Sequence, residues 1–212
     1  MKILQKLVSV TMTATMVIGI GGNLMAAKKN VKIDAAHFPD PEFRKLVSDQ
    51  YDTNHDDILS LDEVEQVSSF KLKNSNITSL EGIEYLQYIK KLSIEECYME
   101  ELDLYDNFSL TDITLYRVHG LKKLTPGILT TNLNVNSCED LTEIDLADTD
   151  YLSRLTLIED RSLTGTLDAS ASIYLTYIYF KNTPISTLYH SKDKVCSFGA
   201  AIVGYRTELI EK

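Results

Sequence analysis

Cysteine and histidine are scarce in this chain, and they form no recognisable chemical motif. Its 212 residues include three cysteines, an odd number that argues against a disulfide framework. The histidines are scattered at His37, His55, His119 and His190. The sequence has no glycine-rich nucleotide loop and no His or Cys pair with the spacing of a zinc site. We therefore expect no catalysis, although a hydrolase assembled from distant residues is an alternative that the sequence leaves open.

Long apolar runs are also lacking, except at the start of the chain. Lys2 and Lys6 precede a mostly apolar stretch over residues 7–20, and small residues follow it up to Ala27. This order is typical of a cleaved secretory signal, so we expect residues 1–27 to be removed and the mature protein to be secreted or cell-surface associated. A membrane anchor is the alternative, but threonines interrupt the run, which falls short of the ~20 apolar residues of a span.

Basic residues are outnumbered by acidic ones. Without Lys2 and Lys6, the count of 21 basic residues falls to 19 against 31 acidic residues, a net charge of −12. This charge repels nucleic acid and anionic membranes, so neither is an expected partner. With 44% hydrophobic and 25% charged residues, the composition is that of a soluble protein that buries a core.

The chain does contain a repeat. Two apolar residues separated by one position recur six times, in steps of 22, 21, 20, 22 and 23 residues. The pairs are Phe70/Leu72, Leu92/Ile94, Ile113/Leu115, Leu133/Val135, Leu155/Leu157 and Ile178/Phe180. Their spacing of two is the period of a strand, and the array lacks the spacing of an amphipathic helix. Steps within about 20–29 residues indicate leucine-rich repeats.

Further apolar residues recur after the predicted strands. They are Leu102, Leu104 and Leu110 in the second repeat, Ile144, Leu146 and Leu152 in the fourth, and Leu167, Ala169 and Leu175 in the fifth. One coil cannot bury both sets, but stacked coils form one continuous core. We predict an α/β repeat solenoid over residues 70–190, a right-handed coil with parallel strands on its concave face.

These motifs resemble those of bacterial leucine-rich-repeat surface proteins. The resemblance covers residues 31–189 and rests on the repeated pairs, on the steps at 102–104 and 144–146, and on the preceding segment FPDPEFRKLVSDQYDTNHDDILSLDEVEQV. It implies an extracellular binding protein without catalytic residues. The family's asparagine or cysteine ladder is irregular here, which predicts distorted middle coils. Its positions read Ser75, Cys97, Val118, Cys138, Asp160 and Thr183.

Two of the cysteines occupy ladder positions. Cys97 and Cys138 lie two predicted coils apart, or roughly 10 Å at the spacing of neighbouring strands. A disulfide tolerates Cα atoms only to about 7 Å, so we expect two buried free thiols. Cys196 lies outside the array.

Residues 28–69 predict a helical cap that contains a loop resembling an EF-hand. Asp40 and Pro41 are a plausible N-cap and first residue of a helix with Phe43, Leu46 and Val47 facing inward. The oxygen-bearing positions of the following loop match positions 1, 3, 5, 7, 9 and 12 of a calcium loop. They are Asp52, Asn54, Asp56, Ile58, Ser60 and Glu63.

This loop predicts a calcium site with one defect. Position 6 favours glycine because it needs a left-handed backbone, and the chain has Asp57 there, at a cost of order 1–2 kcal/mol. Ser60 and Glu63 also have the spacing of a capping box, which would begin the exiting helix. The alternative is an acidic loop that keeps its shape without an ion.

The predicted sheet also presents an outward face on which a partner could bind. Its apolar or amphipathic side chains are Tyr116, Ile158, Tyr177 and Tyr179, and such groups anchor many interfaces. We expect a monomer that binds a protein or a surface glycan here. Alternatively, these tyrosines only stabilise the sheet, and the protein has a purely structural role or is a truncated surface protein. Residues 191–212 are either a C-terminal cap or the stub of a longer array.

Overall fold

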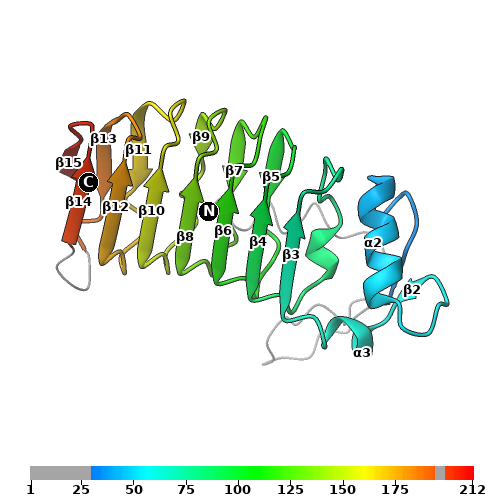
Figure 1. Cartoon of the computed structure of the whole chain (residues 1–212). Coiled ribbons are helices and arrows are strands. Elements are labelled where there is room, and N and C mark those ends of the chain that lie inside the picture. Colours follow the sequence, from blue (N-terminus) through cyan, green and yellow to red (C-terminus); the bar gives the residue numbers. More distant parts are fainter. Residues whose placement is uncertain (1–29, 194–198) are drawn as a thin grey trace, which may run out of the picture.

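The computed structural model describes residues 30–193 and 199–212, and its largest feature is a seven-stranded parallel sheet, here called the main sheet. Its strands lie side by side in chain order along an elongated solenoid (Figure 1). They are β3 (Ser69–Lys73), β4 (Lys91–Glu95), β6 (Asp112–Tyr116), β8 (Asn132–Asn136), β10 (Arg154–Ile158), β12 (Tyr177–Lys181) and β14 (Gly199–Val203). The expected signal, residues 1–27, lies outside the described residues.

Each predicted apolar pair lies on one of these strands and is buried. In β3, for example, Phe70 and Leu72 are buried whereas the residues on either side of them are exposed. The register is unshifted throughout the main sheet, so that Phe70 pairs with Leu92, which in turn pairs with Ile113. The predicted solenoid is therefore confirmed, and the expectation of distorted middle coils is wrong for this sheet.

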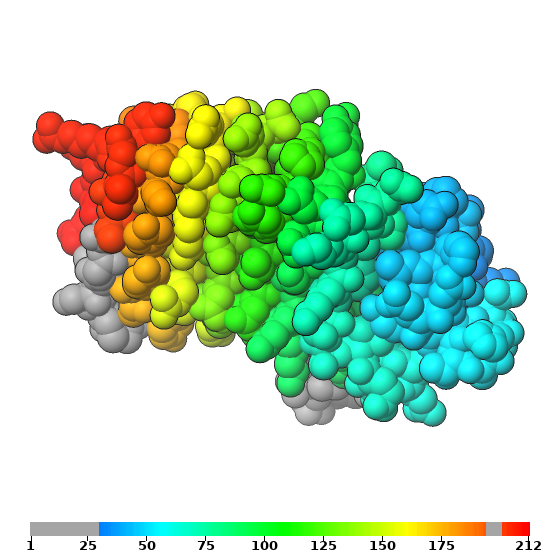
Figure 2. All heavy atoms as spheres, in the orientation of Figure 1, coloured from blue at the N-terminus to red at the C-terminus, as the bar shows by residue number. Residues whose placement is uncertain are grey.

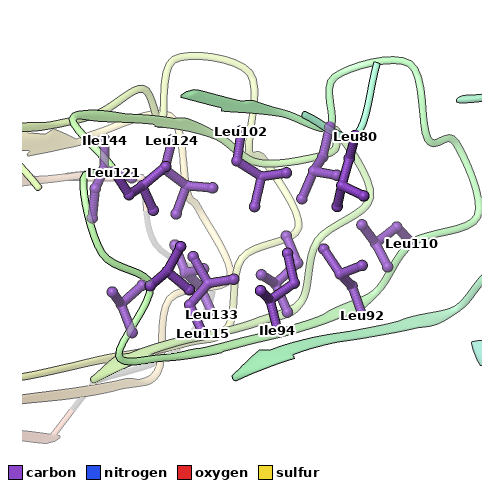
Figure 3. Close-up of a cluster of buried hydrophobic side chains, with 14 of the residues drawn as sticks. Leu80, Leu92, Ile94, Leu102, Leu110, Leu115, Leu121, Leu124, Leu133 and Ile144 are labelled. Carbon is purple, nitrogen blue, oxygen red and sulfur yellow. The ribbon is translucent and has the colours of Figure 1, made fainter. Parts of the chain in front are cut away.

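The opposite wall of the solenoid, here called the return wall, consists of two three-stranded parallel sheets. One contains β5 (Glu101–Asp103), β7 (Lys123–Thr125) and β9 (Glu143–Ile144), and the other contains β11 (Gly165–Ala169), β13 (Ile185–His190) and β15 (Glu208–Glu211). Side chains from the two walls face each other across the interior: Leu102 and Leu124 lie opposite Ile94 and Leu115 (Figure 3). Burial of each such side chain contributes about 1.5–3 kcal/mol.

The return wall is interrupted between its two sheets. Among the described strands, β9 and β11 do not pair with each other, although the main sheet continues unbroken through β8, β10 and β12. A groove of about 380 Å³ lies at the interruption, with Ile144, Leu146 and Leu167 among its lining residues. The irregularity of this repeat therefore appears in the return wall rather than in the main sheet.

The chain leaves each of the first six strands of the main sheet through a residue with positive φ. These residues are Asn74, Glu96, Arg117, Ser137, Glu159 and Asn182, with φ between 49° and 58°. None is glycine, so each costs of order 1–2 kcal/mol. Some neighbours along this row interact: Arg117 donates to Glu96 at 2.8 Å and Asn182 donates to Glu159 at 2.6 Å. The strain recurs because every coil turns at the same place.

The ladder residues follow these turns and point into the core. Cys97 and Cys138 are both buried and free, and burial raises the pKa of the Cys138 thiol to about 12. Asp160 is also fully buried, and its two carboxylate oxygens each accept a backbone N–H at 2.9 Å, from Cys138 and from Ile158. Burial outweighs these hydrogen bonds and raises the pKa of Asp160 to about 7.

The cap covers the N-terminal end of the solenoid (Figure 1). It contains β1 (Val31–Lys32), α2 (Pro41–Tyr51), β2 (Ile58–Leu59) and the single turn α3 (Leu61–Val64); η1 (Ile83–Tyr85) follows in the first coil. The predicted helix is confirmed, with Phe43 and Val47 buried and Leu46 partly buried. Phe43 contacts Phe38 and Phe70 edge-on, at centroid distances of 5.7 and 5.9 Å. No helix among the described residues is long and apolar enough to cross a bilayer.

Asp40 connects the cap to the first coil. One of its oxygens accepts the N–H groups of Glu42 and Phe43, as an N-cap does, while the other accepts the N–H groups of Thr78 and Ser79 and the Thr78 hydroxyl. Partial burial opposes ionisation, but these hydrogen bonds outweigh it and lower the pKa of Asp40. One carboxylate therefore both starts α2 and fixes it against the array.

Asp160 predicts a pH dependence of stability. Because its folded pKa lies above the unfolded value, the folded state binds more protons between about pH 4 and pH 7, and stability falls as pH rises through this window. The change contributed by Asp160 is roughly 4 kcal/mol. We expect Asp160→Asn, which has one acceptor oxygen fewer, to be less stable than the unmodified protein at pH 5 and to close this gap by pH 8.

Urea denaturation at the two pH values measures the effect. Asp145→Asn is the control, since Asp145 is exposed and lies on the return wall. A stability difference between the unmodified protein and Asp160→Asn that is equal at both pH values would contradict the assignment.

Candidate functional site

The outward-facing residues of the main sheet form three ladders that run along the solenoid. From β3 to β12, one contains Ser69, Lys91, Asp112, Asn132, Arg154 and Tyr177; the second contains Lys71, Ser93, Thr114, Asn134, Thr156 and Tyr179; the third contains Lys73, Glu95, Tyr116, Asn136, Ile158 and Lys181. Each strand supplies one residue to a ladder because its side chains alternate between core and solvent. The sequence predicts this face because the apolar pairs fix the register.

Three of the four predicted binding residues lie on two neighbouring strands, where Ile158 pairs with Lys181 rather than with either tyrosine. Tyr177 and Tyr179 lie two residues apart on β12, and Ile158 lies on the neighbouring strand β10. Tyr116 lies two strands away from Ile158, with Asn136 between them. Tyr177 is the most exposed of the four, and the other three are partly buried.

Two arginines contact these tyrosines and were not among the predicted site residues. The guanidinium carbon of Arg154 lies 4.4 Å from the centroid of the Tyr177 ring, and that of Arg117 lies 4.9 Å from the Tyr116 ring. Such cation–π contacts hold the rings and leave a charged group beside each of them. Arg154 immediately precedes a predicted pair, so the repeat itself predicts its place in the Tyr177 ladder, whereas its contact with the Tyr177 ring follows from the structure.

A second pair of tyrosines lies beside the sheet. Tyr151 and Tyr174 are 50% and 42% exposed, and their rings stack with centroids 5.8 Å apart and planes at 6°. Each immediately precedes a buried leucine, Leu152 or Leu175, one coil apart. That shared position is a signal in the sequence that could have identified them.

The charge of the main-sheet face is opposite to that of the whole chain. From β3 to β12, its outward positions carry five basic side chains and two acidic ones, Glu95 and Asp112, which gives a net charge of +3. The basic residues are Lys71, Lys73, Lys91, Arg154 and Lys181. The entire sequence has a net charge of −10. The acidic total therefore does not describe the surface that a partner would meet here.

The predicted calcium loop folds around its two end carboxylates. Asp52 is buried and accepts the N–H groups of Asp56 and Asp57 at 3.2 and 3.0 Å. Asn54 accepts from Asp56, and Asp56 accepts from Ile58. Asp57 has a φ of 59°, so it adopts the left-handed backbone predicted for this position.

Glu63 closes the loop through hydrogen bonds on both of its oxygens. One accepts the N–H and hydroxyl of Thr53 at 2.7 and 2.9 Å, and the other accepts the N–H and hydroxyl of Ser60 at 2.9 and 2.6 Å. Burial opposes ionisation, but these donors outweigh it and lower the pKa of Glu63 to about 2. Ser60 is the N-cap of α3, as predicted, but the expected exiting helix is one turn long.

This geometry does not fit a calcium ion as it stands. In the part of the chain that the structure describes, no three His, Cys, Asp or Glu side chains are grouped so that they could hold a metal. Glu63 already accepts hydrogen bonds on both oxygens, and a bidentate ligand at this position needs them for the ion. The calcium site therefore stays a prediction, and the hydrogen bonds of Asp52 and Glu63 account for the shape of the loop.

A solenoid with parallel strands on one wall, a leucine-filled interior and a capped first coil defines a leucine-rich-repeat protein. Residues 38–171 match the family described as the endo-beta-N-acetylglucosaminidase EndoS LRR domain. The chain belongs to this family of leucine-rich-repeat domains. No curated protein matches it.

Three solved structures with a similar fold are internalins of Listeria monocytogenes. Internalin InlF is 14% identical, with a TM-score of 0.46 over 88% of this chain and 59% of its own. Internalin C2 is 18% identical, with a TM-score of 0.34 over 84% of this chain and 97% of its own. The functional domain of InlJ, described as including a cysteine ladder, is 16% identical, with a TM-score of 0.28 over 81% of this chain and 61% of its own. This chain thus spans less than two thirds of the InlF and InlJ chains.

The hydrogen bonds of Glu63 predict that it stabilises the cap without an ion. Glu63→Gln replaces a charged acceptor of five hydrogen bonds, from Thr53, Asn54 and Ser60, so we expect the protein to lose about 1.5–3 kcal/mol of stability in the presence of a chelator. Asp62→Asn is the matched control, because Asp62 is exposed in the same turn. Thermal unfolding measures both, and an unchanged Tm for Glu63→Gln would contradict this role. A calcium-dependent rise in Tm that is lost in Glu63→Gln would instead establish the ion site.

Proposed function

We propose that this protein is a secreted binding module that captures a protein partner on the main-sheet face. The observation that carries the proposal is the group formed by Tyr177, Tyr179 and Ile158 on a solvent-facing sheet, with Arg154 held against Tyr177. Tyrosine and arginine are enriched among residues that dominate binding energy. Polar side chains of β8 adjoin this group, as in an interface with an apolar centre and a polar rim.

The proposed secretion rests on the signal-like residues 1–27. The binding role, rather than catalysis, is supported by the matched family, which is described as an LRR domain. Capture of a surface glycan instead of a protein is an outcome that the same experiment distinguishes, since it would survive protease treatment of the captured material.

Removal of the tyrosines on the sheet should weaken capture. We expect Tyr177→Ser/Tyr179→Ser to weaken partner binding by at least about tenfold, because loss of one hot-spot side chain costs 2 kcal/mol or more. The matched control is Tyr151→Ser/Tyr174→Ser, which removes two exposed tyrosines from the same coils but outside the sheet face. Affinity capture from secreted and host-surface extracts compares the three proteins, and equal capture by all of them would refute the proposed site.

The positive face predicts that the partner surface is acidic. We expect the association rate to fall with ionic strength, and Lys91→Glu to slow association more than Lys122→Glu. Lys122 is also exposed but precedes β7 on the return wall, so the pair tests the location of the charge at constant net charge. Surface plasmon resonance measures the rates; equal effects of the two substitutions would show that the face does not steer the partner.

A further inference from the structure

The interruption of the return wall is local, because the two coils beside it are in contact both before and after it. Before it, the Asp160 carboxylate accepts the backbone N–H of Cys138 at 2.9 Å. After it, the hydroxyl oxygens of Thr149 and Ser172 lie 3.1 Å apart. Figure 2 shows the coils stacked in contact along the solenoid. The groove between β9 and β11 is therefore an opening between two coils that are fixed to each other on both sides of it.

The start of β11 gives a physical reason for this opening. Gly165 has a φ of 77°, and the register of β11 with β13 shifts between Gly165 and Thr166. Irregularities of this kind bend a strand and interrupt its pairing. As a result, β11 pairs with β13 on one side and does not pair with β9 on the other.

The edge of β9 that faces the groove offers backbone groups for a further strand. The N–H groups of Glu143 and Asp145 both point to the β7 side, where they donate to carbonyl oxygens at 3.0 Å. Because these directions alternate along a strand, the N–H and C=O groups of Ile144 point the other way, toward β11. Among the described strands, none pairs with β9 on that side. An unpaired strand edge is a template for another strand.

Apolar side chains form the floor of the groove, where Ile144, Leu146 and Leu167 line it. Ile144 is 7% exposed, whereas Leu102 and Leu124, at the equivalent position of the two preceding coils, are 3% and 0% exposed. The interior of the solenoid is therefore slightly open at this point. The volume of about 380 Å³ is near the lower end of the range of roughly 300–1,000 Å³ for ligand pockets, so the groove suits a short segment.

The rim of the groove is acidic: its lining residues include Glu143, Asp145 and Asp168, and none is basic. Asp145 and Asp168 occupy equivalent outward positions, and each accepts the N–H of the residue two positions further on. Lysines of the chain itself already contact two of the three carboxylates, Lys123 at 3.5 Å from Glu143 and Lys212 at 2.5 Å from Asp168. Among the described residues, no basic side chain forms an ion pair with Asp145.

We propose that the groove binds an extended, basic peptide segment of a partner, which pairs with the edge of β9. The alternation along a strand sets the pattern of this segment. The residue beside Ile144 points to the floor and is apolar, and the next residue points outward near Asp145 and Asp168 and is lysine or arginine. This site lies on the wall opposite the positive main-sheet face, and it does not rest on the proposed function.

Fluorescence anisotropy with a labelled pentapeptide tests the site. The probe carries valine at position 2, lysine at position 3 and threonine elsewhere, and a comparison peptide has glutamate in place of the lysine. We expect saturable binding of the lysine peptide and at least about tenfold weaker binding of the glutamate peptide, because a like charge then faces the rim. Equal binding of the two peptides, or binding of neither, would overturn the proposal.

A charge reversal in the groove locates the binding. Asp145→Lys should weaken binding of the lysine peptide at least about tenfold. The matched control is Asp103→Lys, because Asp103 is exposed at the equivalent position of β5 and likewise accepts the N–H of Tyr105, but lies outside the groove. Tyr177→Ser/Tyr179→Ser should bind the peptide as the unmodified protein does, so this result is independent of the main-sheet face. Equal effects of the two lysine substitutions would refute the site.

Hydrogen exchange of the unmodified protein gives a measurement that needs no variant to fold. The amide of Ile144 should exchange more slowly when the lysine peptide is bound, because it donates to the added strand, while the amides of β8 and β10 should not change. Protection confined to another surface would contradict the proposal. Equal protection by lysine amide would show that the groove takes an ammonium group rather than a strand, and would contradict it as well.

Discussion

Burial of leucine-like side chains between consecutive coils is the interaction on which the rest of this structure depends. A single coil has two walls and too little interior to cover its own apolar residues, so each coil is stable only against its neighbours. The unshifted register from β3 to β14 follows from this requirement, because a slip of one residue would turn every buried pair to solvent. The strained turns after the strands persist because the stacked coils hold them in place.

This dependence makes the ends of the array as important as its middle. At the N-terminal end, Phe43 and Asp40 close the interior, one by apolar contact and the other by hydrogen bonds to both the helix and the first coil. The acidic loop is part of the same cap. Its Glu63 accepts hydrogen bonds from Thr53 and Ser60 and so fixes the segment between α2 and β3. At the C-terminal end, Leu209 on β15 continues the core position that Leu167 and Leu188 occupy on β11 and β13.

The main-sheet face is a by-product of the same core. Alternation along each strand sends every second residue outward, and stacking aligns these residues into ladders whose composition the core does not constrain. Tyrosine, arginine and lysine at these positions give the face a positive charge on an acidic chain. We propose that these groups give the surface its binding role.

The sequence by itself determined the repeat, its register and the helix that begins at Pro41. Each depends on local spacing: two residues for a strand, about 21 for a coil, and the capping residue Asp40 before the proline. It also placed Tyr177 and Tyr179 on the outward face, which follows from the same alternation. Only the tertiary structure decided that Glu63 is satisfied by Thr53 and Ser60, and that the return wall is interrupted between β9 and β11. These features depend on how separate segments of the chain pack against one another, and the pattern of apolar residues does not specify that packing.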